Sequence, residues 1–414
     1  MTPRPLHAVQ FPPSAAERML AALAAALDGS GPAILPLDPG LPAAALTAAL
    51  EAFAPATIET MAGTSTVGVT PRGNPPPVLA DETAVVIATS GSTGVQKGVQ
   101  LSAAAMMASA AASLRRIGAR PGERWLCCLP TFHISGIGVL VRSLLTGTNP
   151  VVVPAVSPDV LTASGCAHVS LVPTQLRRLL DAGANPGQVK TVLLGGAAAA
   201  DTLLAEAGAA GWRVITTYGM SETSGGCVYA GAPLDNVQVR LGPGGQIEIG
   251  GPVLFGGYLG QPELTASALA DGWFHTSDLG QWRADGRLDV LGRSDDVINT
   301  GGEKVVPGEV EAVLGTCEGV ADVVVIGLPD PEWGEAVTAF VVPADPGGLP
   351  QLDRLRSAVR EVLPARAAPR KLVFVPEFPL LPSGKPDRAA LRTIGVQCPN
   401  PDPDQNAIKH AHVK

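Results

Sequence analysis

The chain has 414 residues, enough for two or three domains, and its 29 basic and 37 acidic side chains give a net charge of −8. Without a basic stripe, the sequence argues against a nucleic-acid partner, so local groups must hold any anionic substrate. No apolar run approaches the roughly 18 residues of a membrane span, and the start lacks a signal-peptide pattern. The six cysteines form no C-x-x-C pair, which argues against a zinc site and fits a reducing cytoplasm.

Strands that alternate with helices predict a largely parallel α/β sheet in the first part of the chain. The first 80 residues are rich in alanine and proline, with one expected helix over 14–27 that Ser14 would cap. A hairpin is expected from a buried strand at 84–88 to a short strand at 99–101, followed by a helix that Ser102 caps. Further strands are expected at 125–129, 151–153, 168–172, 192–194 and 214–217, with helices at 102–116, 136–145, 174–182 and from about Asp201.

The pattern changes after Tyr218, where hairpins replace the alternation of strands and helices. A Gly-Pro-Gly-Gly turn lies between two expected strands, so residues 235–293 form the β-rich part of a large N-terminal domain, 1–293. A small α+β domain, 294–395, is expected to follow, and residues 396–414 are polar and expected to be disordered. The small domain should contain helices at 307–314 and 352–363 and strands at 320–328, 337–342 and 372–375.

The most informative motif is a loop rich in glycine and hydroxyl groups that follows the buried strand at 84–88. Its glycines let backbone N–H groups turn toward an anion, while its hydroxyls and one lysine add donors and positive charge. This pattern predicts a polyphosphate cradle, although Gly98 after Lys97 excludes the common nucleotide-hydrolase loop. A flexible linker is the weaker alternative, because linkers seldom follow a buried strand directly. The cradle residues are Thr89, Ser90, Gly91, Ser92, Thr93, Gly94 and Lys97.

Four later motifs each allow a chemical role and a plainer structural one. Glu222, in a motif that opens from a strand end, can hold Mg²⁺ beside Ser221, or the two residues can begin a helix. Asp278 can accept two ribose hydroxyls or lie in a turn, and residues 292–311 can form a hinge or a surface turn. Lys385, on a glycine-flanked loop, can neutralise a carboxylate that attacks a phosphate, or it can be solvated.

The order and spacing of these motifs resemble the adenylate-forming superfamily of acyl-CoA synthetases, adenylation domains and luciferases. The 2-succinylbenzoate–CoA ligases of menaquinone biosynthesis are the most similar branch. The resemblance implies an α/β N-terminal domain of parallel-sheet and β-rich subdomains and a small mobile α+β C-terminal domain. The superfamily motifs are 89–98, 218–223, 273–280, 292–311 and 382–388, and the branch motifs are 130–136, 141–145 and 170–176.

The resemblance also implies a ligase that works in two half-reactions. A carboxylate first attacks ATP–Mg²⁺ to give an acyl-adenylate and pyrophosphate, and coenzyme A then displaces AMP. In that scheme Lys385 bridges the carboxylate and the α-phosphate, Glu222 binds Mg²⁺, Asp295 is the hinge, and Gly301 and Gly302 open a tunnel for coenzyme A. ATP would be bound by the cradle together with Gly195, Gly196, Ala197, Tyr218, Gly219, Ser221, Asp278 and Arg293.

The acid is expected to be an aromatic dicarboxylate, whose second carboxylate needs a cationic partner. Arg142 follows His133 on one expected helix. Its apolar neighbour Val141 indicates that Arg142 is buried, and a buried arginine would require an anion beside it. A surface arginine is the plainer alternative. The acyl-binding set would be Arg142, Ser170, Ser135 and His133, of which His133 is also placed among the catalytic residues.

Three other functions stay open: a ligase for another aryl or acyl acid such as a benzoate, an adenylation enzyme that loads a carrier protein, and a non-catalytic relative. Arg142 argues against a monoacid, and the retained lysines and carboxylates of the site argue against a non-catalytic protein. The cradle begins at Thr89, early for this superfamily, so a shortened N-terminal subdomain is expected. A homodimer is left open.

Overall fold

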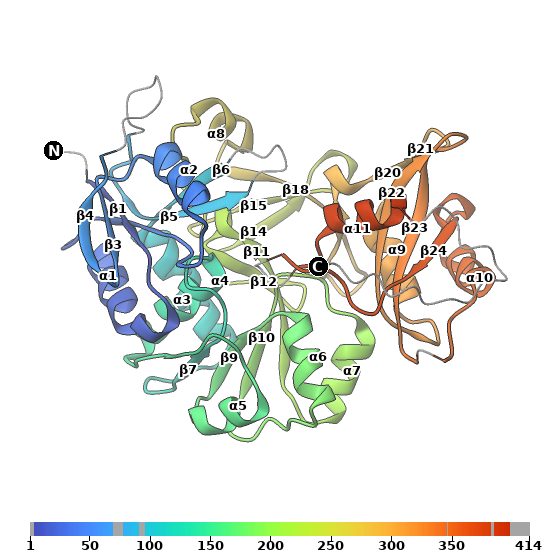
Figure 1. The fold of residues 1–414 in the computed structure, drawn as a ribbon, viewed down its shortest axis with the longest axis horizontal. Helices are drawn as coiled ribbons and strands as arrows, with labels where there is room; N and C mark the ends of the chain where they lie inside the picture. Colours follow the sequence, from blue (N-terminus) through green and yellow to red (C-terminus); the bar gives the residue numbers. More distant parts are fainter. Residues whose placement is uncertain (1–3, 69–77, 91–95, 346, 382–384, 398–414) are drawn as a thin grey trace. The chain divides into compact units, whose positions relative to one another are not determined.

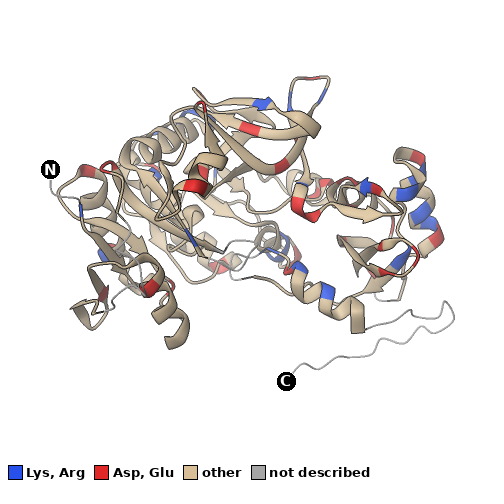
Figure 2. Cartoon of the chain, turned by 90° about the horizontal axis from the view of Figure 1, so that it is seen from above, with Lys and Arg blue, Asp and Glu red and all other residues tan. Residues whose placement is uncertain are grey.

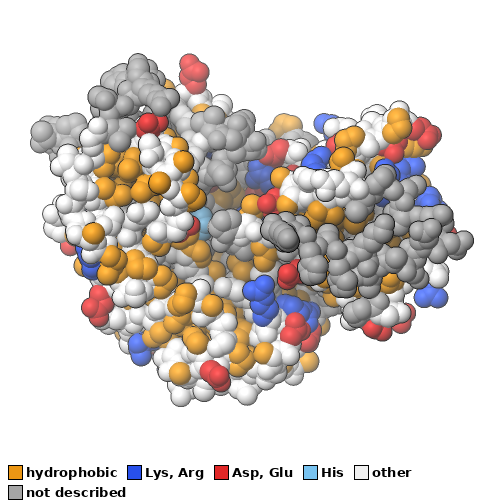
Figure 3. All heavy atoms as spheres, in the orientation of Figure 1, with side chains coloured by type: hydrophobic (Ala, Val, Ile, Leu, Met, Phe, Trp, Pro, Cys, Tyr) orange, Lys and Arg blue, Asp and Glu red, His pale blue; other side chains and the backbone are white. Residues whose placement is uncertain are grey.

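The chain divides into two compact units in the computed structural model, which describes residues 4–68, 78–90, 96–345, 347–381 and 385–397. The first unit comprises residues 1–199 and 203–290, and the second comprises 200–202 and 291–414 (Figure 1). Basic and acidic residues are interspersed along both units (Figure 2), so the charge around any site is set by its own neighbours. Exposed apolar side chains form scattered patches on the face in Figure 3, as is usual for a folded protein.

A seven-stranded sheet opens the first unit, and four of its strands lie in the N-terminal stretch for which the sequence predicts only one helix. These four strands all precede the cradle hairpin in the chain. Strands β1, β2, β3 and β5 run parallel, whereas β4, β6 and β16 are antiparallel to their neighbours. The strand order is β16 (Gly257–Tyr258), β6 (Gln96–Ser102), β5 (Thr83–Ser90), β2 (Ala33–Pro36), β1 (Leu6–Val9), β3 (Thr57–Thr60) and β4 (Gly63–Thr66).

A second seven-stranded sheet contains the strands that the alternating pattern predicts. Strands β7 to β11 run parallel, so their carboxyl ends meet at one edge, and β12 and β13 return antiparallel. Its strand order is β13 (Ala232–Pro233), β12 (Gly225–Tyr229), β11 (Val214–Met220), β10 (Thr191–Leu194), β9 (His168–Leu171), β7 (Trp125–Cys127) and β8 (Val151–Val152). The connecting helices are α5 (Pro158–Ser164), α6 (Pro173–Asp181) and α7 (Asp201–Ala209).

Two helices, α3 (Ala103–Ile117) and α4 (Ile134–Thr146), pack between the two sheets (Figure 1). On α4, Ile137 belongs to the core under the first sheet, whereas Val139 belongs to the core on the second. Because both faces of α4 are covered, its charged residue Arg142 is only 9% exposed. The remaining helices of the first sheet are α1 (Ala16–Asp28) and α2 (Ala43–Phe53).

The rest of the first unit is β-rich, as the Gly-Pro-Gly-Gly turn predicts. Strands β14 and β15 form the expected hairpin, and β15 continues antiparallel onto β18. The elements are β14 (Gln238–Leu241), β15 (Gln246–Gly250), β17 (Leu269–Ala270), β18 (Trp273–Trp282), β19 (Leu288–Arg293) and the helix α8 (Pro262–Ala268).

The second unit is a five-stranded sheet with three helices, and α9 (Pro307–Leu314) has the predicted bounds. At the start of α11 (Arg388–Gln397), Arg388 donates to the Val325 carbonyl at 2.7 Å and to Glu311 Oε1 at 2.8 Å. These bonds tie α11 to the sheet and to α9. The other elements are β20 (Ile298–Thr300), β21 (Glu303–Val305), β22 (Val320–Asp330), β23 (Gly334–Pro343), β24 (Lys371–Phe374) and α10 (Leu352–Val362).

Two local predictions are wrong. Ala15, not Ser14, is the N-cap of α1, and no side chain caps that helix. Helix α11 runs to Gln397 and so includes the first two residues of the expected disordered tail, because Leu391 and Ile394 pack it onto the second unit's core. In the part of the chain that the structure describes, five cysteines are free thiols and no helix has the length and apolarity needed to cross a membrane.

Replacing Ser102 with alanine tests the predicted cap of α3. The Ser102 hydroxyl accepts a hydrogen bond from the Ala105 N–H at 3.1 Å, so its loss should lower the free energy of unfolding by about 1 kcal/mol. Ser14→Ala is the matched control, because Ser14 also precedes a helix but does not cap it. Denaturant unfolding compares the two variants, and equal shifts would contradict the cap.

Candidate active site

The carboxyl edge of the second sheet gathers five of the predicted nucleotide-binding residues. Gly195, Gly196 and Ala197 follow β10, and Tyr218 and Gly219 lie at the end of β11. A Cβ on Gly195 would lie 2.3 Å from Thr217 Oγ1, so the two strand ends approach too closely for a side chain there. Parallel α/β sheets bind ligands at this edge, which makes it the candidate nucleotide site.

Gly219 lies at an irregularity in the sheet. The register between β11 and β12 shifts between Tyr218 and Gly219, and a Cβ on Gly219 would lie 2.1 Å from the Gly225 carbonyl oxygen. A bulge of this kind changes the direction in which the neighbouring side chains point. The strand therefore needs glycine at this position to present Tyr218 and the motif that follows.

The structure brings Tyr218 and Asp278 together from different sheets. The Tyr218 hydroxyl donates to Asp278 Oδ2 at 2.7 Å, and Asp278 on β18 is 8% exposed. Burial, with the charge of Asp278 and this hydrogen bond, raises the pKa of Tyr218, so the phenol stays a protonated donor. The two residues predicted for the adenine and the ribose thus share one hydrogen bond.

Glu222 and Lys97 are linked through Tyr258, which the sequence does not single out. The Tyr258 hydroxyl donates to Glu222 Oε1 at 2.9 Å, and Lys97 Nζ lies 5.4 Å from the centre of the Tyr258 ring. Burial and the Glu222 carboxylate raise the pKa of Tyr258, which keeps its proton on the shared bond. Tyr258 stands on β16, which pairs with β6 of the cradle hairpin at Val99. Only that pairing brings the ring to the site, and it has no short-range sequence signal.

The cradle hairpin forms as predicted, with Thr89 paired to Lys97 across β5 and β6. The Thr89 hydroxyl donates to the Lys97 carbonyl at 3.4 Å. The tip residues Gly91, Ser92, Thr93 and Gly94 lie outside the described residues, and the Ser90 side chain is not described either. Their phosphate-binding role therefore stays a prediction.

Ser221 and Glu222 occupy a short 3-10 turn, Ser221–Thr223, directly after β11. Thr223 closes the turn, because its hydroxyl accepts from the Met220 N–H at 2.9 Å and donates to the Gly225 carbonyl at 2.7 Å. Ser221 is 8% exposed. The plainer alternative, in which these residues begin a helix, is not met, because the 3-10 turn ends at Thr223 and strand β12 follows.

Arg142 and Ser170, both predicted to bind the acyl substrate, are in contact. The guanidinium Nη2 donates to Ser170 Oγ at 3.0 Å, and both side chains are buried. In the described chain, Arg142 has no carboxylate partner and its Nε has no hydrogen-bond acceptor. Beside it lies a cavity of about 10 Å³, room for one water, bordered by Gly138, Ser109 and Ser224. Since Ser224 directly follows the Ser221–Thr223 turn, this cavity adjoins the predicted metal motif.

His133 and Ser135 lie at the start of α4. His133 is the N-cap residue, its ring lies 4.6 Å from that of Phe132, and Ser135 on the first turn is exposed. A Cβ on Gly225 would lie 3.9 Å from an Ile134 side-chain carbon. The helix start thus lies close to the residues that follow Glu222.

Five predicted site residues belong to the second unit: Arg293, Asp295, Gly301, Gly302 and Lys385. Arg293 donates to Asp295 Oδ2 at 2.7 Å, in an exposed pair at the predicted hinge. Gly301 and Gly302 are the two central residues of the β20–β21 hairpin, with φ of +60° and +81°. Such a turn favours two glycines, so the hairpin alone explains their identity. Lys385 is exposed, and its carbonyl accepts from the Leu381 N–H at 2.8 Å.

Two family models match the chain: AMP-binding enzyme over residues 59–259, and AMP-binding enzyme C-terminal domain over residues 309–385. A probable 2-succinylbenzoate–CoA ligase of Mycobacterium tuberculosis is 44% identical over 327 residues, which cover 76% of this chain and 85% of that protein. The chain belongs to the AMP-binding enzyme family. This confirms the adenylate-forming superfamily and an AMP-forming ligase.

Solved structures agree with the predicted fold. The o-succinylbenzoate CoA synthetase (MenE) from Bacillus subtilis, in complex with the acyl-adenylate intermediate OSB-AMP, has a TM-score of 0.78 at 27% identity, covering 94% of this chain and 88% of that one. The same Bacillus enzyme in complex with ATP and a magnesium ion has a TM-score of 0.78 at 26% identity, covering 94% and 89%. An α/β enzyme of the adenylate-forming fold is therefore confirmed.

Gly219→Ala should disrupt the edge at which these residues gather. The added Cβ would fall 2.1 Å from a backbone oxygen, so the enzyme should unfold at a lower temperature, with a loss of roughly 2–4 kcal/mol, and lose nucleotide binding. Gly208→Ala is the control, because a Cβ there meets nothing within 4 Å and alanine stabilises a helix interior by about 1 kcal/mol. Thermal unfolding of both variants checks this, and a neutral Gly219→Ala would refute the crowding.

Proposed function

We propose that the enzyme is a 2-succinylbenzoate–CoA ligase of menaquinone biosynthesis. It would convert 2-succinylbenzoate, ATP and coenzyme A into 2-succinylbenzoyl-CoA, AMP and pyrophosphate. Relatives of that name at 44% identity and the similar Bacillus structure with OSB-AMP support this activity. The observation that carries the choice of acid is Arg142, a buried cation at the site that has no carboxylate partner within the described residues.

Adenylation makes the carboxylate reactive. A free carboxylate repels nucleophiles and would have to expel an oxide, whereas an acyl-adenylate expels AMP. The chain must therefore bring two anions together, the acid and the α-phosphate, and offset their repulsion with positive charge. We assign Lys97 and the cradle to the β- and γ-phosphates, and Lys385 to the attacking carboxylate and the α-phosphate.

Glu222 fits a magnesium ligand. No group of three or more metal-ligating side chains occurs in the described part of the chain, so Mg²⁺ at Glu222 would take its other ligands from phosphate oxygens and water, as it prefers. Tyr258 binds one oxygen of this carboxylate and fixes its orientation. When bound, the ion would supply positive charge to the phosphates. Ser221, beside Glu222, would contact a phosphate oxygen.

Arg142 suits the second carboxylate of a dicarboxylic acid. A buried arginine is costly unless an anion or several acceptors compensate its charge, and among the described residues only the Ser170 hydroxyl accepts from it. A carboxylate would complete the pair. Because the cavity beside it holds only about one water, the acid must displace part of the lining, and the flexible Met106 side chain is suited to that movement. Ser135 and His133 would line the approach.

The roles in the second unit are proposed on the resemblance alone. Asp295 would be the hinge residue, Arg293 would hold the ribose with Asp278, and Gly301 and Gly302 would line the passage for coenzyme A. We also propose a cytoplasmic location, supported by the five free thiols among the described residues.

Arg142→Met tests the choice of acid. In the wild type, pyrophosphate release should favour 2-succinylbenzoate over 4-oxo-4-phenylbutanoate and 2-butanoylbenzoate, each of which lacks one carboxylate. Loss of a charged hydrogen-bond partner should lower kcat/KM for the dicarboxylate by about 10–100-fold. The kcat/KM for whichever of the two monoacids is the better substrate should stay unchanged. Arg116→Met is the control, because Arg116 donates to the Ala232 and Pro233 carbonyls and lies outside the proposed acid site. A wild type that prefers benzoate-type monoacids would overturn the proposed acid.

Tyr258→Phe tests the support of Glu222. Loss of the phenol hydroxyl should raise the Mg²⁺ concentration for half-maximal activity by about 10-fold, as is usual when a partner of a metal ligand is removed. Tyr229→Phe is the matched control, since Tyr229 bonds Ser113 at 2.8 Å inside the core. Magnesium titration of pyrophosphate release separates the two, and an unchanged requirement in Tyr258→Phe would refute the role.

A further inference from the structure

A continuous stack of three buried side chains ends at the proposed acid site. The Arg142 guanidinium carbon lies 4.5 Å from the centre of the Trp125 ring, and the Trp125 and His168 rings lie 4.8 Å apart, tilted by 34°. Trp125 is 0% exposed and His168 is 1% exposed. The stack is not explained by any role assigned above.

Strand register produces this stack. Trp125 on β7 pairs with His168 on β9, and Cys127 pairs with Ser170. Since side chains two residues apart point to the same face of a sheet, His168 and Ser170 both face α4, which carries Arg142. One pair of strands therefore supplies both the ring beneath the guanidinium and the hydroxyl that it binds.

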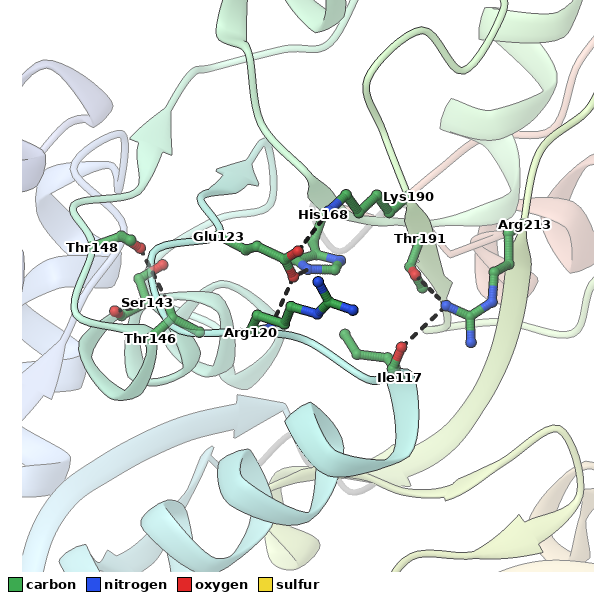
Figure 4. Close-up of polar contacts among 10 residues, drawn as sticks. All are labelled: Ile117, Arg120, Glu123, Ser143, Thr146, Thr148, His168, Lys190, Thr191 and Arg213. Carbon is green, nitrogen blue, oxygen red and sulfur yellow. Dashed lines mark hydrogen bonds and ion pairs between the residues drawn. The ribbon is translucent and has the colours of Figure 1, made fainter.

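The far end of the stack is tied to Glu123. Figure 4 shows His168 and Lys190 converging on this carboxylate, at 2.9 Å from His168 Nε2 and 2.7 Å from Lys190 Nζ. Burial raises the pKa of Glu123, but hydrogen bonds from Lys190, the Arg120 N–H and His168 outweigh it and lower that pKa to about 2. Glu123 is thus ionised and accepts a hydrogen bond from Nε2–H of His168.

His168 is held as a neutral ring. Burial lowers the pKa of His168, the Lys190 and Arg142 charges add to that effect, and the Glu123 bond opposes it. The bond to Glu123 fixes both the ring plane and the tautomer of His168, as partners of a buried imidazole do. The fixed His168 ring in turn packs against Trp125, which leaves the indole one face for the guanidinium.

This arrangement compensates the charge of Arg142 without occupying its donors. A carboxylate partner would stabilise the buried cation but would use the N–H groups that recognise an acid. The face of an indole attracts a guanidinium through its quadrupole and takes none of those N–H groups. The only hydrogen bond from Arg142 in the described chain goes to Ser170, and Nε has no acceptor.

We propose that Trp125 and His168 are positioning residues, which hold the Arg142 guanidinium over the Trp125 ring so that its N–H groups stay available for the second carboxylate of the acid. This inference rests on the proposed function, and extends it from the residue that binds the acid to the residues that prepare it. It predicts that Trp125 and His168 set selectivity between dicarboxylates and monoacids rather than the rate of adenylation itself.

The test compares Trp125→Leu, which removes the aromatic face, with Trp125→Phe, which keeps one. Pyrophosphate release is measured with 2-succinylbenzoate and with the two monoacids, 4-oxo-4-phenylbutanoate and 2-butanoylbenzoate. Trp125→Leu should lower the selectivity for the dicarboxylate by about tenfold, through KM more than kcat, and Trp125→Phe should recover most of it. Trp212→Leu is the matched control, because Trp212 is also buried but lies outside the stack, and its selectivity should not change.

Equal losses with dicarboxylate and monoacid in Trp125→Leu would show a purely structural role and overturn the inference, while the proposed function would stand. A wild type without activity on 2-succinylbenzoate would overturn the proposed function itself, and the inference with it. If Trp125→Leu does not fold, His168→Leu and His168→Gln replace it. His168→Leu should reduce selectivity and His168→Gln, which can still donate to Glu123, should restore it; no difference between them would refute the role.

Discussion

The burial of one guanidinium between two sheets is the constraint on which the proposed acid site depends. Helix α4 is covered on both faces, so Arg142 is largely removed from water and its charge must be compensated inside the protein. The compensation comes from a ring and a hydroxyl on two paired strands. The pairing of β7 with β9 therefore supplies both groups that contact the buried guanidinium.

The nucleotide residues are held by a related device, in which a buried phenol donates to a carboxylate. Tyr218 holds Asp278 and Tyr258 holds Glu222, and burial keeps both phenols protonated. Each carboxylate is thereby oriented by the protein alone, which would reduce the reorganisation needed to bind ribose and a metal ion in the roles proposed above. Tyr258 also lies beneath Lys97, so its ring contacts the cradle hairpin while its hydroxyl binds Glu222 on the neighbouring turn.

Features with a local cause could be predicted from the sequence, and those with a distant cause could not. The cradle hairpin, the Ser102 cap and the bounds of α9 follow from turn, cap and periodicity signals within a few residues. Strands β1 to β4 have four residues each and alternate poorly, and their place is fixed by partners elsewhere in the sheet. Tyr258 and Trp125 were missed for the same reason, since their contacts arise only from long-range pairing.

The position of Glu123 helps to separate a recognition arginine from one that merely packs. If Arg142 served only to pack the core, the simplest stabilising neighbour would be a carboxylate in direct contact, because an unpaired buried charge is costly. A partly buried carboxylate, Glu123, does occur in this region, but it lies beyond Trp125 and His168 and is bonded to His168 and Lys190 instead. The Glu123 carboxylate is thus separated from the Arg142 guanidinium by the rings of Trp125 and His168. Such spacing is unfavourable for an isolated core arginine and favourable for one that must accept the carboxylate of a substrate.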